Sequence, residues 1–539
     1  MTIPEFDAGV FHYASRRELV YGKKGMVASS HPLASQAGLE ILKKGGNAID
    51  AAIAAAATLT VVEPGSNGIG GDSFSILWKD GELYGLNASG HAPEQLTREN
   101  LLKKGHEEIP THGIDPITVP GVPAGWVELN KKHGKLPLKE VLEPAAKIAE
   151  DGFPVSNVVS NAWKRTFKIL KKKLEQFPEL ETWFSTFAPE GHPIEPGEIW
   201  SSKGHARTLR LIGETDGEAF YKGEIAEAID RTSKNYQGFI RKEDLKEYKP
   251  EWIVPISTNY KGYDIWEMPP NGQGIIALMA LSILENLELK GKDDPETIHK
   301  QIEAVKLAFS DGQATITDLK HMNETVDRLL SKDYAKTRAA LVQEEALDPK
   351  PGIRDYSGTV YLAAADEEGN MISYIQSNYM GFGSGVVVPE YGVSLQNRGC
   401  GFTMEEGHPN VVGPNKKPFH TIIPGFITKG NQPVGPFGIM GGQMQPQAHL
   451  QVVSSIIDFH LNPQNALDAP RWHWDEGKKV SIEPEMPLSI IEDLIKRGHE
   501  VTIVPGKGLF GRGQIILRES NGVLIGGTEP RADGHIATW

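Results

Sequence analysis

The sequence contains a single cysteine, Cys400, in 539 residues. An intramolecular disulfide is therefore excluded, and this composition is typical of a reducing compartment, so we expect a cytoplasmic protein. Cys400 has no partner motif beside it that would mark a thiol nucleophile, and that role is the weaker alternative.

Long apolar runs and basic blocks are also missing from the sequence. The longest apolar stretch, Ala51 to Val62, is shorter than the ~20 residues that span a bilayer and is predicted to be a buried helix. The stretch Met1 to Gly25 mixes charges and Pro, so we expect no signal peptide there. With 56 basic against 70 acidic residues the net charge is −14, which is unfavourable for binding nucleic acid. We therefore expect neither a membrane nor a nucleic-acid partner.

The residues that are present are those of a soluble enzyme with a sizeable core, 39% hydrophobic and 23% charged. Apolar spacing, capping residues and Gly or Pro stops predict helices over residues 32–44, 48–59, 156–177 and 295–309. Residues 252–266 are instead typical of β-structure.

A glycine-rich loop, SNGIGGDS at residues 66–73, precedes the apolar run Phe74 to Trp78. Its glycines suit a close approach between backbone segments. The loop lacks both Gly-Lys-Ser/Thr and a regular GxGxxG, so it is not predicted to bind phosphate.

The chain changes character ahead of residue 359. Lys332 to Ser357 is charged and includes the turn-forming run DPKPG, which predicts a mobile excursion. Thr359 to Ala365 and Met371 to Ser377 are then predicted to be the two strands of a hairpin. Thr359 therefore opens a central strand directly after an irregular segment.

Several motifs, in order, resemble the γ-glutamyltransferase and cephalosporin-acylase family of N-terminal-nucleophile hydrolases. The matching stretches, between Met26 and Arg531, are MVASSHPLASQAGLEILKKGGNAIDAAIAA, VVEPGSNGIGGDSF, ITVPGVPAGW, GTVYLAAADEEGN, FGSG, GPNKKPFHT, MGGQ, DAPRWHW and GGTEPR. The resemblance implies an α+β, four-layer αββα fold. It also implies a precursor cut between Gly358 and Thr359, with residues 1–358 as the large subunit and 359–539 as the small catalytic subunit, intertwined in one domain.

The resemblance makes Thr359 the nucleophile, and the chemistry gives a reason. A threonine hydroxyl needs a base within reach. Cleavage before Thr359 would free an α-amine with a pKa of about 7.7–8.0, which can serve as that base. The small residue Gly358 leaves room for attack on its own carbonyl. Without the surrounding motifs, Thr359 would be interpreted as an ordinary β-branched strand residue.

Further catalytic residues are implied by position in the family motifs. Gly441 and Gly442 match the paired amides that form the family's oxyanion hole, and the weaker alternative is that the pair forms only a turn. Ser377 occupies the place of a threonine that hydrogen-bonds to the nucleophile, and a serine hydroxyl can do the same.

The sequence departs from typical γ-glutamyltransferases where they hold the glutamyl head group. The N-A-R-E motif is replaced by residues 87–91, NASGH, and the N-N-x-x-D-D-F stretch by residues 396–402, QNRGCGF. Both charged anchors are absent, so we expect a different acyl group. The substrate-binding residues expected from these positions and their neighbours are Ser89, His91, Asn378, Tyr379, Arg398, His420 and Thr421.

Arg398 and His420 could bind a carboxylate at the far end of an acyl group, as in glutaryl amides, or could be a structural pair. His106, His112 and His473 show no metal-ligand spacing such as HExxH, and we expect neither a metal nor a cofactor.

These observations favour an autoprocessing, acylase-like amidohydrolase acting on a small-molecule amide, with the two pieces of its own precursor as partners. One alternative is a glutathione-hydrolysing γ-glutamyltransferase. An alternative of another class is an uncleaved, inactive binding scaffold.

Overall fold

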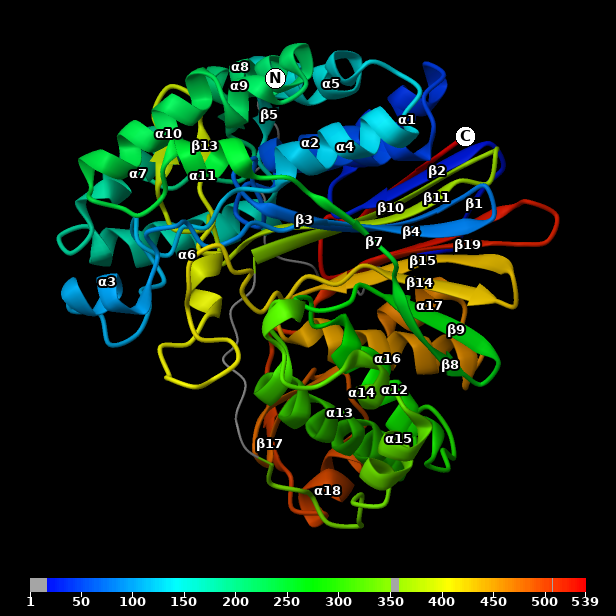
Figure 1. The fold of residues 1–539 in the computed structure, drawn as a ribbon. Coiled ribbons are helices and arrows are strands. Elements are labelled where there is room, and N and C mark those ends of the chain that lie inside the picture. Colours follow the sequence, from blue (N-terminus) through cyan, green and yellow to red (C-terminus); the bar gives the residue numbers. More distant parts are fainter. Residues whose placement is uncertain (1–16, 350–357, 507) are drawn as a thin grey trace, which may run out of the picture.

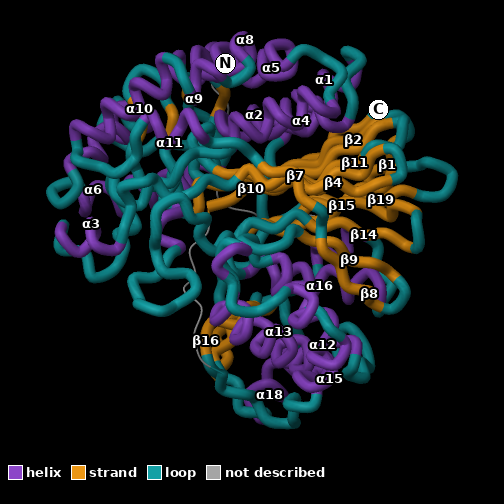
Figure 2. The backbone as a smooth tube through the Cα atoms, viewed as in Figure 1, coloured by secondary structure: helices purple, strands orange, loops and turns teal. Residues whose placement is uncertain are grey.

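Two seven-stranded antiparallel sheets lie at the centre of the protein, whose computed structural model describes residues 17–349, 358–506 and 508–539 (Figures 1 and 2). The first sheet has the order β21 (His535–Thr538), β2 (Gly25–Ser29), β10 (Gly358–Asp366), β11 (Met371–Tyr379), β3 (Asp72–Lys79), β4 (Glu82–Ala88), β7 (Glu251–Ile253). The second has the order β1 (Val20–Gly22), β20 (Leu524–Thr528), β19 (Arg512–Arg518), β15 (Gln432–Met440), β14 (Gly425–Lys429), β9 (Tyr263–Glu267), β8 (Ile256–Tyr260).

The sheets pack face to face through one apolar cluster. Tyr361 and Ile375 enter it from the first sheet, and Phe426 and Ile516 enter it from the second. Every residue of β10 is buried, because this central strand is covered by the second sheet on one face and by helices on the other. That burial explains why its sequence, GTVYLAAAD, is apolar on both faces rather than alternating.

Helices form an outer layer on each side (Figure 1). Those on the side of the first sheet are α1 (Pro32–Lys43), α2 (Ala48–Val62), α4 (Val122–His133), α5 (Leu138–Asp151) and α8 (Lys203–Thr215), extended by α3 (Arg98–Lys103), α6 (Asn157–Lys173), α7 (Glu181–Phe187), α9 (Glu218–Tyr221), α10 (Glu224–Asn235) and α11 (Lys242–Glu247). Those on the side of the second sheet are α12 (Gly274–Glu285), α13 (Pro295–Thr315), α14 (Val326–Leu329), α15 (Lys332–Ala339), α16 (Met444–Ile457), α17 (Pro463–Asp468) and α18 (Leu488–Lys496). The predicted four-layer αββα fold is confirmed.

Smaller elements complete the described chain. They are β5 (Phe153–Pro154), β6 (Ile199–Trp200), β12 (Val387–Val388), β13 (Val393–Ser394), β16 (Trp472–Glu476), β17 (Lys479–Ile482), β18 (Glu500–Ile503) and the 3₁₀ turns η1 (Pro178–Leu180), η2 (Leu319–His321) and η3 (Arg398–Gly401). Of these, η3 lies in the site described below.

Residues from both sides of position 358 share the two sheets. In the first sheet β10 pairs with β2, and β11 pairs with β3. In the second, β14 pairs with β9. A chain cut before Thr359 would therefore keep its two pieces joined by continuous β-ladders.

The helix before the glycine-rich loop forms for the reasons expected from its sequence. Asn47 caps α2 by accepting hydrogen bonds from the backbone N–H groups of Ile49 and Asp50, and the Asp50 side chain completes a capping box. Gly71 then packs against the β11 backbone, where an added Cβ would come 2.5 Å from the Ser377 carbonyl oxygen. The predicted close backbone approach is therefore confirmed.

Several boundaries differ from the prediction, and α2 and α13 run on to Val62 and Thr315 instead of ending at residues 59 and 309. Helix α6 ends at Lys173, with three lysines in its last turn, and Pro178 begins a 3₁₀ turn instead of stopping the helix directly. Residues 332–339 form α15, capped by Ser331, rather than an irregular excursion, because burial of Ala335 and Ala339 is enough to hold a short helix. Residues 350–357 of that segment, and residues 1–16 of the N-terminal stretch, lie outside the described residues. Within the described residues no helix is both long and apolar enough to span a bilayer.

Candidate active site

Thr359 lies at an irregularity in the central ladder. Its partner on β11 is Ser377, while Gly358 pairs with Tyr379, so the register shifts between Gly358 and Thr359. A Cβ on Gly358 would come within 2.7–2.9 Å of the backbone of Met380 and Gly381, which only glycine avoids. The peptide bond at this position therefore sits on a β-bulge, where a ladder is locally open.

The Thr359 hydroxyl faces Ser377. Thr359 Oγ1 donates to Ser377 Oγ at 3.0 Å, and Ser377 Oγ donates to the carbonyl oxygen of Gly358 at 2.5 Å. Both side chains are buried, Thr359 with 1% of its surface exposed. One serine hydroxyl thus contacts both the Thr359 hydroxyl and the carbonyl group that precedes Thr359.

Arg398, from η3, is completely buried beside this pair. Its Nη2 lies 3.4 Å from Ser377 Oγ, its Nη1 donates to Thr421 Oγ1 at 2.9 Å, and its guanidinium stacks 4.0 Å above the Tyr379 ring. Burial lowers the pKa of Arg398 to about 10, so the group is still a cation at neutral pH. Among the residues that the structure describes, no carboxylate forms an ion pair with it.

His420 and Asp72 form a second buried pair next to Arg398. His420 Nε2 lies 3.1 Å from Asp72 Oδ2, and Asp72 is the ladder partner of Ser377. Because His420 Nδ1 accepts from the Ile422 N–H, the imidazole proton is on Nε2 and points to Asp72. Burial, aided by the charge of Arg398, lowers the pKa of His420 to about 4 and keeps the imidazole neutral.

Gly441 and Gly442 connect β15 to the start of α16 and adopt φ values of +147° and +59°. Such angles favour glycine. Gln273 Nε2 donates to the carbonyl oxygens of Thr421, at 2.6 Å, and Gly442, at 2.9 Å. A chain of contacts thus runs from Thr359 through Ser377, Arg398 and Thr421 to the glycine pair, whose oxyanion role stays a prediction.

Three other predicted residues lie apart from this chain of contacts. Ser89 Oγ donates to Asn87 Oδ1 at 2.7 Å, and His91 is partly exposed, with Nδ1 beside the Ala92 carbonyl oxygen. The Asn378 side chain is buried against Gly68 and Gly71, and neither of its polar atoms has a hydrogen-bond partner in the described chain. Their substrate-binding roles stay predictions.

Asp72 and Gln273 belong to the same network and were not predicted. Asp72 stands in the glycine-rich loop motif, directly after Gly70-Gly71, so the motif itself carried a signal. Gln273 had no such signal, because its function is to bond backbone carbonyls from distant segments. Cys400 lies two residues after Arg398 in the chain. Burial raises the pKa of its thiol to about 12, which disfavours a thiolate nucleophile.

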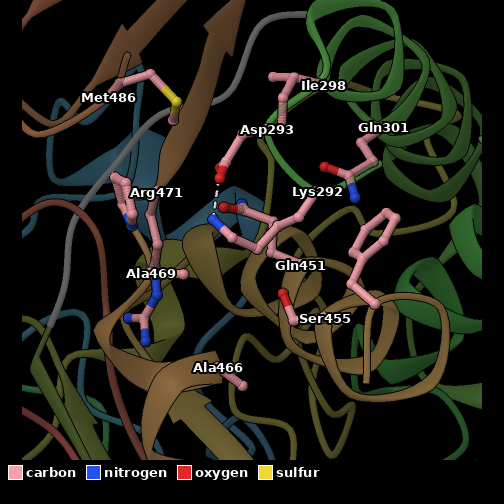
Figure 3. Close-up of a pocket in the computed structure, with 12 residues that line it drawn as sticks. Lys292, Asp293, Ile298, Gln301, Gln451, Ser455, Ala466, Ala469, Arg471 and Met486 are labelled. Carbon is pink, nitrogen blue, oxygen red and sulfur yellow. Dashed lines mark hydrogen bonds and ion pairs between the residues drawn. The ribbon is translucent and has the colours of Figure 1, made fainter. Parts of the chain in front are cut away.

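A pocket of about 690 Å³ opens beside the site. Its wall includes Tyr379, the last residue of β11, Met380 directly after it, and Gly401 from η3. Phe419 and Gln443, the neighbours of His420 and Gly442, also line it. Figure 3 shows a different cavity, lined by Lys292, Asp293 and Arg471 among others, with a volume of only about 30 Å³. That space is about one water molecule in size, so the larger pocket is the candidate substrate entrance.

One group of ligand-type side chains, His299, Glu303 and His499, was found within the described ranges. Its ligand atoms lie within 4.8 Å of one another, but Glu303 Oε1 is 2.8 Å from Lys306 Nζ, and the two histidines hydrogen-bond to each other at 2.9 Å. The Glu303 carboxylate is therefore already paired with the Lys306 ammonium group. The group bonds to Gln343 O and Leu347 N, and we interpret it as a buried anchor for that segment.

A four-layer αββα sandwich with a threonine at the start of a central strand, hydrogen-bonded to a serine on the next strand, is the architecture of an N-terminal-nucleophile hydrolase. Residues 34–539 match the family model described as gamma-glutamyltranspeptidase. This chain belongs to the gamma-glutamyltranspeptidase family, so the family predicted from the sequence motifs is confirmed. The chain is a hydrolase, as its named relatives are.

Individual relatives carry different activities in their names. The chain shares 53% sequence identity with the cephalosporin acylase from Bacillus halodurans, over 99% of each chain. The structure of this protein and the crystal structure of that acylase superpose with a TM-score of 0.97. The chain is 38% identical to the glutathione hydrolase-like YwrD proenzyme of Bacillus subtilis (strain 168), covering 96% of this chain and 98% of the relative. It is 32% identical, over the same shares, to the oxamate amidohydrolase proenzyme of Klebsiella pneumoniae.

Proposed function

We propose that this protein is made as a precursor, is cut between Gly358 and Thr359, and hydrolyses amides whose acyl group carries a carboxylate. The observation that carries the proposal is the buried position of the Arg398 side chain beside Ser377. Arg398 is a buried cation that touches Ser377, the residue bonded to Thr359, and it lacks a carboxylate partner among the described residues.

The proposed cleavage uses the contacts at the β-bulge. Thr359 Oγ1 attacks the Gly358 carbonyl carbon, and its proton is relayed by Ser377 Oγ to the Thr359 nitrogen, which leaves as the amine. The Ser377 hydroxyl is already bonded to the Gly358 carbonyl oxygen and can stabilise the charge that develops there. Breaking the C–N bond gives an ester of Thr359 and a free α-amine, and water then hydrolyses the ester to a carboxylate on Gly358.

The proposed turnover repeats this chemistry on a substrate. The freed α-amine of Thr359 takes the hydroxyl proton as Oγ1 attacks the amide carbonyl, and the Gly441 and Gly442 amides hold the oxyanion. The amine then returns the proton to the leaving nitrogen. Water hydrolyses the acyl-enzyme and restores the threonine hydroxyl.

The Arg398 guanidinium favours acyl groups that carry a carboxylate. Within the described residues its two Nη atoms bond to the hydroxyl groups of Ser377 and Thr421, and a substrate carboxylate could accept both donors in a bidentate pair. A buried cation gains more from such a pairing than an exposed one because the surroundings screen it poorly.

The relatives leave two acyl classes to distinguish. Oxamate, named for the Klebsiella relative, is an amide with a free carboxylate, in keeping with the proposal. The glutathione hydrolase-like relative points instead to a γ-glutamyl group. Ser89 and Gly401 stand where typical γ-glutamyltransferases have charged anchors, and a glutamyl α-amine would lie close to Arg398, a repelling cation. This supports the carboxylate-only acyl group.

The test compares kcat/KM of the mature enzyme for glutaryl-anilide and γ-glutamyl-anilide, which differ only by the α-amine. We expect glutaryl-anilide to be hydrolysed at least as well. A roughly hundredfold preference for the γ-glutamyl compound, ~2.7 kcal/mol in transition-state binding, would reject the proposal and support glutathione-type activity. Butanoyl-anilide, which lacks the carboxylate, is the matched control, and oxamate, malonamate and succinamate would then measure the preferred chain length.

Two further expectations remain proposals. A large and a small subunit from one precursor would be the enzyme's partners, as the proenzyme names of its relatives support. A reducing compartment, the cytoplasm, is supported by the single cysteine.

A further inference from the structure

The candidate substrate entrance stops short of the residues proposed to act on the substrate. The described residues that line this pocket include Tyr379 but not Thr359, Ser377 or Arg398. The side chains of those three are buried, Arg398 completely, whereas Tyr379 is partly exposed. The pocket thus ends before it reaches either the proposed nucleophile or the buried cation.

The Tyr379 ring covers the Arg398 guanidinium. Arg398 Cζ lies 4.0 Å from the centre of the ring, a cation–π contact. The hydroxyl groups of Ser377 and Thr421 contact the two Nη atoms of the same guanidinium. Of these three side chains only Tyr379 also lines the pocket, so its ring is the one that stands between the cation and the entrance.

The backbone of Tyr379 is held in an unusual conformation. Its φ of +76° is rare for a bulky residue, and such angles persist where the surrounding contacts determine them. Here the Tyr379 N–H donates to Ser377 Oγ at 2.8 Å, and Tyr379 pairs with Gly358 in the ladder. Because these contacts hold the backbone, the ring leaves Arg398 only by rotating about its own side-chain bonds.

We propose that the Tyr379 side chain is a movable cover on Arg398. The ring turns aside to let an acyl carboxylate reach the guanidinium, and it then closes over the ion pair and keeps the water of the pocket away. The carboxylate in this inference rests on the proposed function, whereas the covering of Arg398 does not. Tyr379 thereby determines specificity, because an acyl group without a carboxylate forms no ion pair that would offset the lost contact between ring and cation.

The cover strengthens charge pairing by excluding water. Opposite charges attract more strongly in surroundings of low dielectric constant, and dissolved salt screens exposed pairs much more than buried ones. An uncovered Arg398 would bind the carboxylate more weakly, and its affinity would depend on ionic strength. These two consequences separate a cover from a side chain that only fills space.

The first experiment measures access to Arg398 without turnover. The purified full-length protein is treated with phenylglyoxal, which modifies arginine side chains, and the labelling of Arg398 is followed by peptide mass relative to the exposed Arg328. Arg398 should be labelled slowly in the wild type and in Tyr379→Phe, which keeps the ring. In Tyr379→Gly, whose backbone tolerates the positive φ, Arg398 should be labelled about tenfold faster or more.

The second experiment compares glutaryl-anilide with butanoyl-anilide in the mature enzyme. We expect Tyr379→Gly to lower the preference for glutaryl-anilide in kcat/KM by about tenfold, mainly through KM, because water then reaches the ion pair. Raising NaCl to about 0.5 M should slow the hydrolysis of glutaryl-anilide much more in this variant than in the wild type. Met404→Ala, a change at another residue that lines the pocket, is the matched control and should keep the wild-type preference.

Equal labelling of Arg398 in the wild type and in Tyr379→Gly would overturn the inference, and this result does not depend on whether the variant is processed. An unchanged preference for glutaryl-anilide in Tyr379→Gly would also overturn it, provided that the wild type has this preference. If the wild type has no such preference, the proposed function fails, and the labelling rates alone decide whether Tyr379 covers Arg398.

Discussion

Thr359 Oγ1 and Ser377 Oγ lie 3.0 Å apart across the central ladder, and the same serine hydroxyl reaches the Gly358 carbonyl oxygen. This arrangement places the attacking hydroxyl, a proton acceptor and the carbonyl to be attacked within hydrogen-bond contact before any cleavage. This geometry is what the proposed self-processing of the uncleaved chain requires.

Replacing Ser377 should therefore slow processing. Ser377→Ala removes the donor to the Gly358 carbonyl oxygen, and the loss of one such donor costs a factor of roughly 10²–10³ in rate. Ser377→Thr keeps the hydroxyl and should retain most of the rate. The measurement is the conversion of precursor to two bands over time on a denaturing gel. Processing of Ser377→Ala at the wild-type rate would show that this hydroxyl does not participate.

Gly358 should be required for processing but not for turnover. A methyl group at this position would meet the Met380 and Gly381 backbone at 2.7–2.9 Å, so Gly358→Ala should shift the bulge and slow cleavage severalfold or more. Once cut, residue 358 is a chain end, and the mature fraction should have normal kcat. Gly291→Ala, where a Cβ meets nothing within 4 Å, is the control. Equal processing rates for the two variants would contradict the steric account.

The pH profile should have two limbs. The rate rises as the Thr359 α-amine loses its proton near pH ~7.7–8.0. For carboxylate-bearing acyl groups, kcat/KM falls again near pH 10, where Arg398 loses its charge. Butanoyl-anilide, without a carboxylate, should lack the upper fall.

Replacing Asp72 tests whether the upper limb of the pH profile comes from Arg398. The Asp72 charge raises the pKa of Arg398 against the dominant lowering by burial, so Asp72→Asn should move the upper limb to lower pH. An upper limb that is unchanged in this variant, or that is shared by butanoyl-anilide, would argue against Arg398 as the carboxylate partner.

Much of this site could be predicted because the residues proposed as catalytic lie in short motifs with local meaning. GTVYLAAAD identified a buried strand beginning at Thr359, and the glycine pair in MGGQ needs backbone angles that favour glycine. The connections between motifs could not be predicted. The pairing of Asp72 with Ser377 depends on how two distant strands meet in the sheet. The hydrogen bonds from Gln273 to the carbonyl oxygens of Thr421 and Gly442 likewise depend on how distant segments pack.

Acid should destabilise the protein before it titrates most carboxylates. Burial lowers the pKa values of His31, His205 and His420 to about 4, below the unfolded value of 6.5. Between pH 6.5 and 4 the unfolded chain binds protons that the folded chain does not, so stability falls as the pH drops through this range, by roughly 1.4 kcal/mol per pH unit for each such histidine. Urea midpoints at pH 7, 5.5 and 4.5 measure the effect. A constant midpoint would mean that these imidazoles are protonated in the folded state.

The most direct test of the account is the intact mass and N-terminal sequence of the purified protein, wild type beside Thr359→Ala. We predict that the wild type gives two chains, residues 1–358 and 359–539, with the smaller one beginning Thr-Val-Tyr-Leu. Thr359→Ala should remain one inactive chain of 59.0 kDa. An active wild-type enzyme that stays uncut, or a Thr359→Ala variant cut at the same bond with normal turnover, would contradict the claim that Thr359 frees and then uses its own amine.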